Sequence, residues 1–204
     1  MNYDIISLFA SNIFKSKLDV DHTEAFNAIK ANTEFLQHST GDCYVSKNFN
    51  ILDEYLSLKE DVESTFNYFK DNVLKYESTE FKITTSWATK VRPNGISHFH
   101  NHKNCMYSGV LYIDDLKFCA PIEFINSNLY QDSFLINQPS EINIYNSNKW
   151  MVHPSKNTII FFPSYLMHRV GLHNSDETRY SIAFNLMPNG IFGSADSTVR
   201  LEIF

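Results

Sequence analysis

Residues 158–187, TIIFFPSYLMHRVGLHNSDETRYSIAFNLM, decide the fold. An apolar run at Thr158–Phe162 ends in a Pro-Ser turn. After His168 and a short polar loop, a second run begins at Arg179 and reaches Met187. Polar and apolar residues alternate in this second run, which predicts a half-buried strand. Short strands joined by turn residues, with no helical pattern between them, favour an antiparallel sheet over a parallel βαβ arrangement.

The same two-residue period occurs upstream. One face of a predicted strand carries Phe81, Ile83, Thr85, Trp87, Thr89 and Val91. They alternate with Lys82, Thr84, Ser86, Ala88 and Lys90, and an Arg-Pro-Asn-Gly turn ends the run. Further strands are expected at Met106–Ile113, Phe118–Phe124, Glu141–Tyr145 and Val199–Phe204. We therefore expect an antiparallel sandwich or barrel from about residue 79 onward.

The first third of the chain has a helical pattern after an opening strand-like run, Ile5–Phe14. Asp21 can cap a helix whose apolar residues recur as far as Phe35 and Leu36, before residues 38–41 break it. A second helix keeps one apolar stripe from Leu52 to Val73. Each helix has a single apolar face, so we expect both to pack on the outer face of the sheet.

Length and composition indicate one globular domain. The chain has 204 residues, a mass of 23.7 kDa, 43% hydrophobic residues and a formal net charge of −6. We expect a single domain, 1–204, in which 1–78 supply a strand and supporting helices and 79–204 form the β core. No run of Lys or Arg is long enough to track phosphates, so nucleic acid is not an expected partner.

Neither a membrane nor an oxidising compartment is expected. No stretch approaches eighteen consecutive apolar residues. The three cysteines are an odd number without CxxC spacing, and the N-terminus lacks a basic region followed by a long apolar run. These features predict a cytoplasmic protein.

Five of the eight histidines lie in two short regions, ISHFHNHKN and PSYLMHRVGLHN. Residues two apart in extended chain point to the same side, so His100 and His102 can present their imidazoles to one point. His168, from a distant strand, would complete a facial site of the kind that divalent iron accepts. His98 and His100, which are also two residues apart, are a second possible pair of ligands. The remaining histidines lack such neighbours and are expected to be structural or surface residues: His22, His38, His153 and His173.

Alternation also predicts a ligand-binding face on the last long strand. Arg179, Ser181, Ala183 and Asn185 share one face, while the opposite, apolar face can pack under the helices. A buried, unpaired guanidinium costs several kcal/mol, and a dianionic ligand removes that cost. The alternative is a salt bridge from Arg179 to Asp176 or Glu177 at the rim.

These motifs together resemble a known family. A histidine followed about ten residues later by Arg-x-Ser, as in His168 and Arg179-Tyr180-Ser181, resembles the distal half of the double-stranded β-helix of Fe(II)- and 2-oxoglutarate-dependent oxygenases. Residues 86–113, SWATKVRPNGISHFHNHKNCMYSGVLYI, resemble the Trp, His-x-His and Ser-Gly-Val-x-Tyr pattern of a bacterial and phage family of such oxygenases, distantly similar to prolyl hydroxylases. The resemblance runs from about Ser86 to Asn185.

The resemblance implies a jelly-roll (double-stranded β-helix, cupin-like) enzyme with the two N-terminal helices on its outer sheet. It implies an oxidoreductase, a dioxygenase that uses Fe(II), 2-oxoglutarate and O₂, hydroxylates its substrate and releases succinate and CO₂. By the same resemblance, His100, His102 and His168 hold the metal, and Arg179, Ser181 and Tyr112 bind the C5 carboxylate of 2-oxoglutarate. Trp87 and Phe162 are expected in the core.

One departure from the wider superfamily leaves alternatives open. The superfamily uses His-x-Asp or His-x-Glu, and this chain has His100-Asn101-His102. Three neutral ligands do not reduce the +2 charge of the metal ion, which makes the ion more Lewis acidic. The identity of the metal is therefore open. The alternatives are a three-histidine, cupin-type thiol dioxygenase, which does not need Arg179 and Ser181, and a non-enzymatic jelly-roll binding protein.

The substrate is not determined by the sequence. A protein side chain and a small molecule are both open, because analogy of fold does not identify a substrate. The Asn-rich stretch Asn126–Asn148 has the length and polarity of a lid loop, and a disordered insertion would have the same features.

Overall fold

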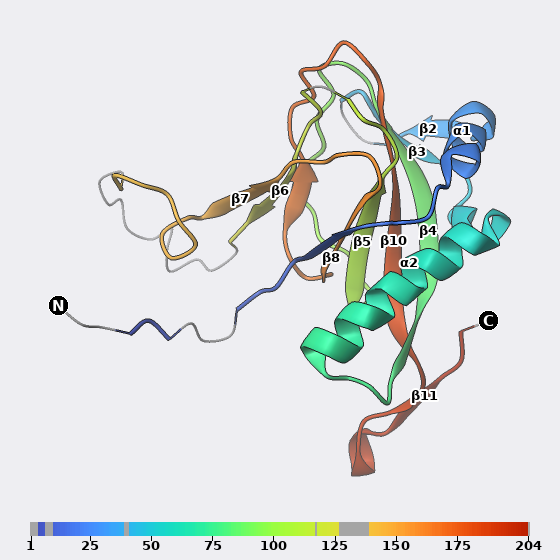
Figure 1. Ribbon diagram of the computed structural model, residues 1–204, viewed down its shortest axis with the longest axis vertical. Coiled ribbons are helices and arrows are strands. Elements are labelled where there is room, and N and C mark those ends of the chain that lie inside the picture. The colour runs from blue at the N-terminus through green and yellow to red at the C-terminus, as the bar shows by residue number, and fades with distance from the viewer. Residues whose placement is uncertain (1–3, 7–9, 39–40, 117, 127–138, 204) are drawn as a thin grey trace.

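The computed structural model describes residues 4–6, 10–38, 41–116, 118–126 and 139–203 (Figure 1). The strands are β1 (Phe14–Lys17), β2 (Phe35–Gln37), β3 (Cys43–Ser46), β4 (Glu80–Val91), β5 (Tyr107–Tyr112), β6 (Ile122–Ile125), β7 (Lys149–Val152), β8 (Thr158–Pro163), β9 (His168–Val170), β10 (Arg179–Phe192) and β11 (Val199–Leu201). The helices are α1 (Thr23–Asn32) and α2 (Leu56–Phe69), with short turns η1 (Ile51–Glu54), η2 (Lys70–Leu74) and η3 (Ala195–Ser197).

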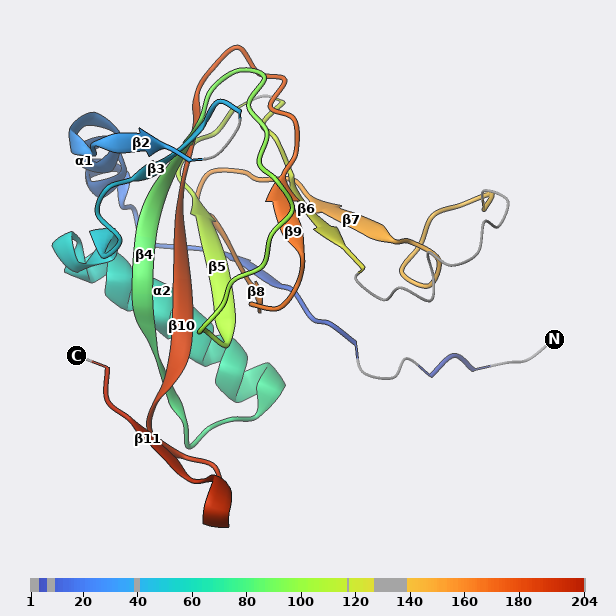
Figure 2. The ribbon, with the colours of Figure 1, turned by 180° about the vertical axis from the view of Figure 1, so that it is seen from behind.

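Two antiparallel sheets face each other. Within the described residues, the larger has the order β1-β8-β5-β10-β4-β3-β2, with β11 paired to β10, and the smaller has the order β7-β6-β9. Figure 2 shows β6 and β9 in front of the larger sheet. Apolar side chains of β5, β6 and β8 form a small core cluster between the sheets. This arrangement is a double-stranded β-helix, or jelly roll, as expected.

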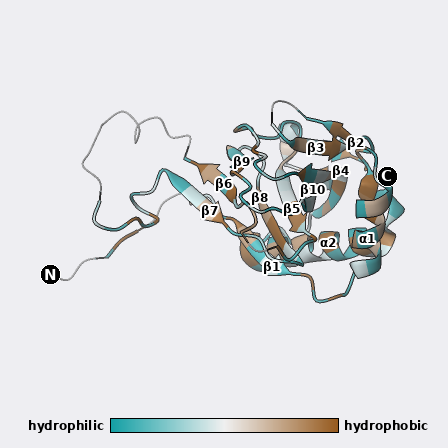
Figure 3. Ribbon diagram, turned by 90° about the horizontal axis from the view of Figure 1, so that it is seen from above, coloured by the Kyte–Doolittle hydropathy of each residue, from teal (hydrophilic) through white to brown (hydrophobic). Residues whose placement is uncertain are grey.

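The two helices cover the outer face of the larger sheet. Figure 1 shows α2 crossing β4, β10 and β5, and in Figure 3 both helices carry hydrophobic and hydrophilic segments. Phe26 and Ile29 of α1 join Val62, Phe66 and Phe69 of α2 in one core cluster with the inner strands. No helix among the described residues is long and apolar enough to cross a membrane.

Several expected elements differ in position. The strand predicted over Ile5–Phe14 begins only at Phe14 in the described chain, and the first helix ends at Asn32, so Phe35 and Leu36 lie in strand β2. The N-cap of α1 is His22, one residue after the predicted Asp21, and Asp21 instead accepts a hydrogen bond from the amide of Thr23, the first helical residue.

The prediction was also wrong in the Asn-rich stretch. No strand forms at Glu141–Tyr145, and the strand that pairs with β6 is β7, a few residues later. The prediction missed β9 because its three residues are too few to show a period. Residues 127–138 of the proposed lid loop lie outside the described residues.

A β-bulge changes the face of β4. Asn185 pairs with Thr85 but Leu186 pairs with Ile83, so Thr84 is an extra residue in β4. Because one extra residue reverses the alternation, Phe81 and Ile83 pack in the helix-covered core, whereas Thr85, Trp87 and Thr89 face the space between the sheets. The sequence alternation predicted a single shared face for all of them, and that prediction was wrong.

Candidate functional site

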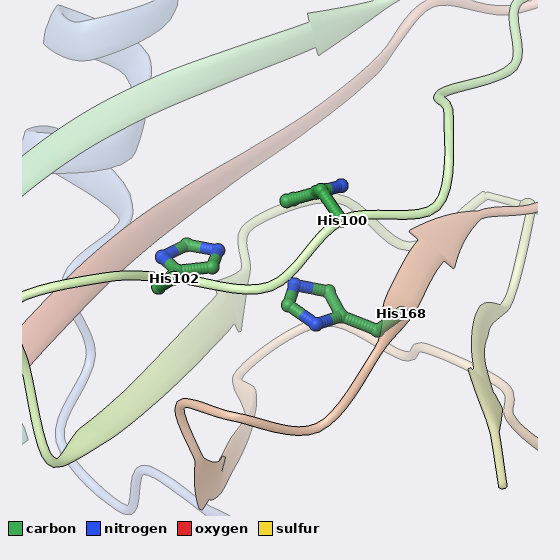
Figure 4. A group of neighbouring side chains, drawn as sticks. All are labelled: His100, His102 and His168. Atoms are coloured by element: carbon green, nitrogen blue, oxygen red, sulfur yellow. The ribbon is translucent and has the colours of Figure 1, made fainter. Parts of the chain in front are cut away.

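His100, His102 and His168 converge between the two sheets (Figure 4). The first two lie on the loop from β4 to β5, and the third opens β9. The backbones of His100 and His168 exchange two hydrogen bonds, with N···O distances of 2.9 and 2.8 Å. The amide of His102 donates to the carbonyl oxygen of Ser164 at 3.0 Å. The loop is therefore fastened to the chain around His168 by its own backbone.

The three imidazoles are close enough to share one ion. One nitrogen from each lies within 4.8 Å of the others, and the centroids of the His100 and His168 rings are 4.5 Å apart. His168 is buried, His102 is half-buried and His100 is exposed. Because exposure increases from His168 to His100, one side of the group is open to a ligand.

Each of these histidines has an oxygen atom beside Nδ1. The distances are 2.8 Å from His100 to the carbonyl oxygen of His98, 2.8 Å from His168 to that of Leu166, and 2.8 Å from His102 to Asn185 Oδ1. A carbonyl oxygen can only accept, so Nδ1 carries the hydrogen and Nε2 keeps a free lone pair. The three lone pairs are the donors that a metal ion requires.

Burial keeps the two inner imidazoles neutral. It lowers the pKa of His168 to about 3, and it also lowers the pKa of His102. Protons therefore do not compete for these nitrogens near neutral pH.

Asn185 of β10 is a residue whose role sequence reasoning missed. Its amide nitrogen donates to Thr85 Oγ1 at 2.9 Å, and its Oδ1 accepts from Ser108 Oγ at 2.8 Å. These two contacts fix the amide so that Oδ1 faces His102. The alternation of β10 placed Asn185 on the polar face, but only the fold brings it beside a histidine 83 residues away in sequence.

Arg179 and Tyr112 form the other end of the site. Arg179 is 2% exposed, and its guanidinium carbon lies 5.1 Å from the centroid of the Tyr112 ring. Its Nη1 donates to Ser181 Oγ at 3.2 Å, and Ser181 contacts Thr89 Oγ1 at 2.6 Å. Arg179 Nε and the Tyr112 hydroxyl are buried without a hydrogen-bond partner.

The expected alternative for Arg179 is not observed. Arg179 is buried, and the side-chain hydrogen bond it donates within the described chain goes to Ser181 rather than to Asp176 or Glu177. The nearby thiols of Cys43 and Cys119 supply no counter-charge, because burial raises the pKa of both. Burial also raises the pKa of Tyr112 to about 12, so its hydroxyl remains a donor. A buried guanidinium without a counter-charge, next to a hydroxyl without a hydrogen-bond partner, calls for an anion.

A single cavity of about 600 Å³ connects the two ends of the site. Its lining includes the three histidines, Arg179 and Tyr112. Phe162 is buried beside it, as expected. Trp87 was expected in the core, but it is half-buried, lines the cavity and stacks on His102 with ring centroids 5.5 Å apart. The bulge at Thr84 puts Trp87 on the cavity face of β4, opposite to the face of Phe81 and Ile83.

The structure thus brings together all six site residues that the sequence singled out. His98 also lines the cavity, but the convergent group is formed with His102 instead. His173 is buried, with Nδ1 accepting from the amide of Ala120 and Nε2 donating to the carbonyl oxygen of Glu177. His22 is buried against Asp61, and His153 is exposed.

The donor set fits a divalent metal, and the unsatisfied Arg179 and Tyr112 fit a dicarboxylate. Neutral imidazole nitrogens suit iron among other transition metals. The two donors lie in the same cavity as the histidines. The fold and the site together fit a metal-dependent jelly-roll enzyme whose cavity can accept an acidic ligand.

The family comparison agrees. A family model described as "Putative 2OG-Fe(II) oxygenase" matches residues 85–185, and the chain belongs to this family. It is a 2-oxoglutarate-dependent oxygenase, an oxidoreductase whose cofactors are Fe(II), 2-oxoglutarate and O₂. No curated protein sequence matches the chain.

Solved structures share the fold at low sequence identity. An oxidoreductase of the 2OG-Fe(II) oxygenase family from Burkholderia pseudomallei has a TM-score of 0.61 and 12% identity, over 85% of this chain and 83% of that one. HygX from Streptomyces hygroscopicus, solved with nickel, 2-oxoglutarate and hygromycin B, has a TM-score of 0.62 and 9% identity, over 87% and 83%. A Pseudomonas putida prolyl-4-hydroxylase has a TM-score of 0.53 and 12% identity, over 87% and 94%. These likenesses establish the fold alone.

Proposed function

We propose that His100, His102 and His168 hold Fe(II), and that Arg179, Ser181 and Tyr112 bind the C5 carboxylate of 2-oxoglutarate, so that the enzyme hydroxylates its substrate and releases succinate and CO₂. The observation that carries this proposal is the unpartnered Arg179 Nε beside the unpartnered Tyr112 hydroxyl, in the same cavity as the three histidines. Either feature alone would be compatible with a purely structural role. Their shared cavity is what a chelating dicarboxylate needs.

Each part of the chain has a defined task in this proposal. The bound iron supplies the redox chemistry that couples oxidative decarboxylation of 2-oxoglutarate to oxidation of the substrate. Arg179 orients the far carboxylate through its planar fork, and the Tyr112 hydroxyl donates a further hydrogen bond. The apolar walls of the cavity limit the access of water.

The thiol-dioxygenase alternative has no supporting observation. Such an enzyme has no need of a buried Arg179 without a counter-charge, and the family match covers both histidine regions and Arg179. Family membership likewise excludes the non-enzymatic alternative.

Slow turnover without the substrate tests this function. We expect the protein to convert 2-oxoglutarate to succinate when it is given Fe(II), ascorbate and O₂, because binding of the cosubstrate does not require the substrate. Succinate is measured by chromatography, and His168→Ala is the inactive control. Oxygen uptake that depends on cysteine-like thiols, with no succinate, would support the thiol dioxygenase instead.

A further inference from the structure

Two aromatic side chains form a ledge beside the three histidines. We call Phe49 and Trp87 the aromatic ledge; their ring centroids are 6.4 Å apart and both line the cavity. Trp87 stacks on His102, so the ledge lies immediately next to the proposed metal position. Phe49 is 52% exposed, although it is a large apolar side chain. The ledge therefore offers apolar surface where a substrate would have to approach.

The register of β4 and β10 places Trp87 between the two ends of the site. Arg179 pairs with Val91, and Asn185, which contacts His102, pairs with Thr85, while Trp87 pairs with Ala183 between them. Phe49 is the more exposed member of the ledge. The outer edge of the ledge is therefore open to a second reactant that enters from solution.

The charges that line the cavity are all positive. None of the described lining residues is Asp or Glu, and the cationic ones are Lys103, Arg169 and Arg179. Arg169 is neutralised by Glu123, at 2.7 Å from Nε to Oε2. Lys103 is exposed, and no acidic residue accompanies it among the described residues that line the cavity. Lys103 is thus left for an anion that comes from solution.

The three-histidine group increases this surplus of positive charge. Three neutral ligands cancel none of the charge of a divalent ion, whereas two histidines and a carboxylate would cancel one unit. 2-Oxoglutarate brings two negative charges against the metal's two and the one on Arg179. The loaded cavity stays positive before Lys103 is counted, which penalises a cationic substrate and favours an anionic one.

We propose that the substrate of this oxygenase is a molecule with a flat apolar ring that carries an acidic group, the ring resting on Phe49 and Trp87 and the acid facing Lys103. This inference rests on the proposed function, since it concerns the second reactant of the same site. Ring-on-ring contact and charge complementarity each supply part of the selectivity.

Binding of a matched set of small probes tests the proposal. The protein, loaded with Fe(II) and 2-oxoglutarate without oxygen, carries Trp150→Phe, so that Trp87 is the only tryptophan and its fluorescence reports the ledge. The probes are 3-phenylpropionate, 3-phenylpropanol, 3-phenylpropylamine and 3-cyclohexylpropionate. We expect affinity to fall in the order carboxylate, alcohol, amine, and the cyclohexyl acid to bind more weakly than the phenyl acid.

Variants separate the ring from the charge. Lys103→Met should weaken 3-phenylpropionate about two- to fivefold and leave 3-phenylpropanol unchanged, because one exposed ion pair is lost. Phe49→Ala, or Phe49→Leu as a milder change, should weaken both phenyl probes about three- to tenfold. Lys17→Met on β1 and Tyr68→Ala on α2 are matched exposed controls that should change neither affinity.

The outcomes distinguish this inference from the proposed function. The visible absorbance of the Fe(II)–2-oxoglutarate complex is recorded in the same samples and reports the cosubstrate site alone. If that absorbance is normal while the amine binds as tightly as the carboxylate, or while no probe binds, the substrate proposal is wrong and the oxygenase assignment stands. If the absorbance is absent, the proposed function has failed, and the substrate proposal fails with it.

Discussion

His102 differs from the other two histidines in what holds its Nδ1. His100 and His168 donate to backbone carbonyl oxygens, whereas His102 donates to the side chain of Asn185. This position is where the wider superfamily has a carboxylate ligand. Since partners behind a ligating histidine set its tautomer and its basicity, Asn185 is a positioning residue that mutation can remove without touching a ligand.

Replacing Asn185 should change metal binding according to the acceptor that remains. Asn185→Leu removes the acceptor and leaves His102 free to rotate, so we expect Fe(II) affinity to fall about 10- to 100-fold. Asn185→Asp keeps an oxygen acceptor for Nδ1–H and should retain binding. Anaerobic metal titration measures both. Unchanged affinity in the Leu variant would show that Asn185 does not position His102.

Arg179 carries the assignment of the cosubstrate. A forked, charge-assisted contact in a buried cavity contributes on the order of 2–5 kcal/mol by truncation. Arg179→Leu should therefore weaken 2-oxoglutarate binding roughly 30-fold to several thousand-fold. Fe(II) binding should survive, because Arg179 does not contact the histidines.

Arg179→Lys should recover part of the 2-oxoglutarate affinity through charge alone, without the fork. Calorimetry on the Fe(II)-loaded protein without oxygen measures both variants. A folded Arg179→Leu protein with wild-type affinity for 2-oxoglutarate would remove Arg179 from the site.

At the scale of elements, alternation in β10 placed its two faces correctly. Ile182, Phe184 and Leu186 join the helix-covered core, and Arg179 and Ser181 face the cavity. In β4 the same reasoning failed, because the bulge at Thr84 depends on pairing with β10 and leaves no local mark in the sequence. Asn185, Phe49 and Lys103 were missed for a related reason, since their neighbours in the site come from other elements.

Gly109 shows where a short motif encodes packing between strands. A Cβ atom at this position would lie 2.4 Å from the Phe184 ring and 2.7 Å from the carbonyl oxygen of Ile160. The Ser108-Gly109 pair was recognisable by resemblance alone. Its physical reason, the close contact of β5 with its neighbours, requires the fold.

The helix α2 should stabilise the fold through its inner face. Phe66 is fully buried and contacts the rings of Phe69, Phe81, Tyr107 and Phe161. Phe66→Ala should lower the free energy of unfolding by about 3–5 kcal/mol. Tyr68→Ala, on the exposed side of the same helix, should change it by less than about 0.5 kcal/mol. Denaturant unfolding measures both, and equal effects would contradict the packing described here.

For the whole molecule, the site depends on two sheets that close on each other. The smaller sheet supplies His168, the β4–β5 loop supplies the other two histidines, and β10 of the larger sheet supplies Arg179. Sequence order separates these parts by up to 79 residues, from His100 to Arg179. Acidic residues give the chain a net charge of −6, yet none of those described lines the cavity. The fold thus encloses a positive site within an acidic protein.

The central claim is that one cavity binds Fe(II) through the three histidines and 2-oxoglutarate beside it. The most direct measurement is an anaerobic titration of Fe(II) with and without 2-oxoglutarate, followed by the visible charge-transfer absorbance that chelation produces. We predict one Fe(II) per chain and a saturable absorbance in the wild type and in His153→Ala, whose histidine is exposed. The absorbance should be lost in His100→Ala, His102→Ala and His168→Ala. Its persistence in His102→Ala together with its loss in His98→Ala would contradict the register, and its persistence in all three variants would contradict the account.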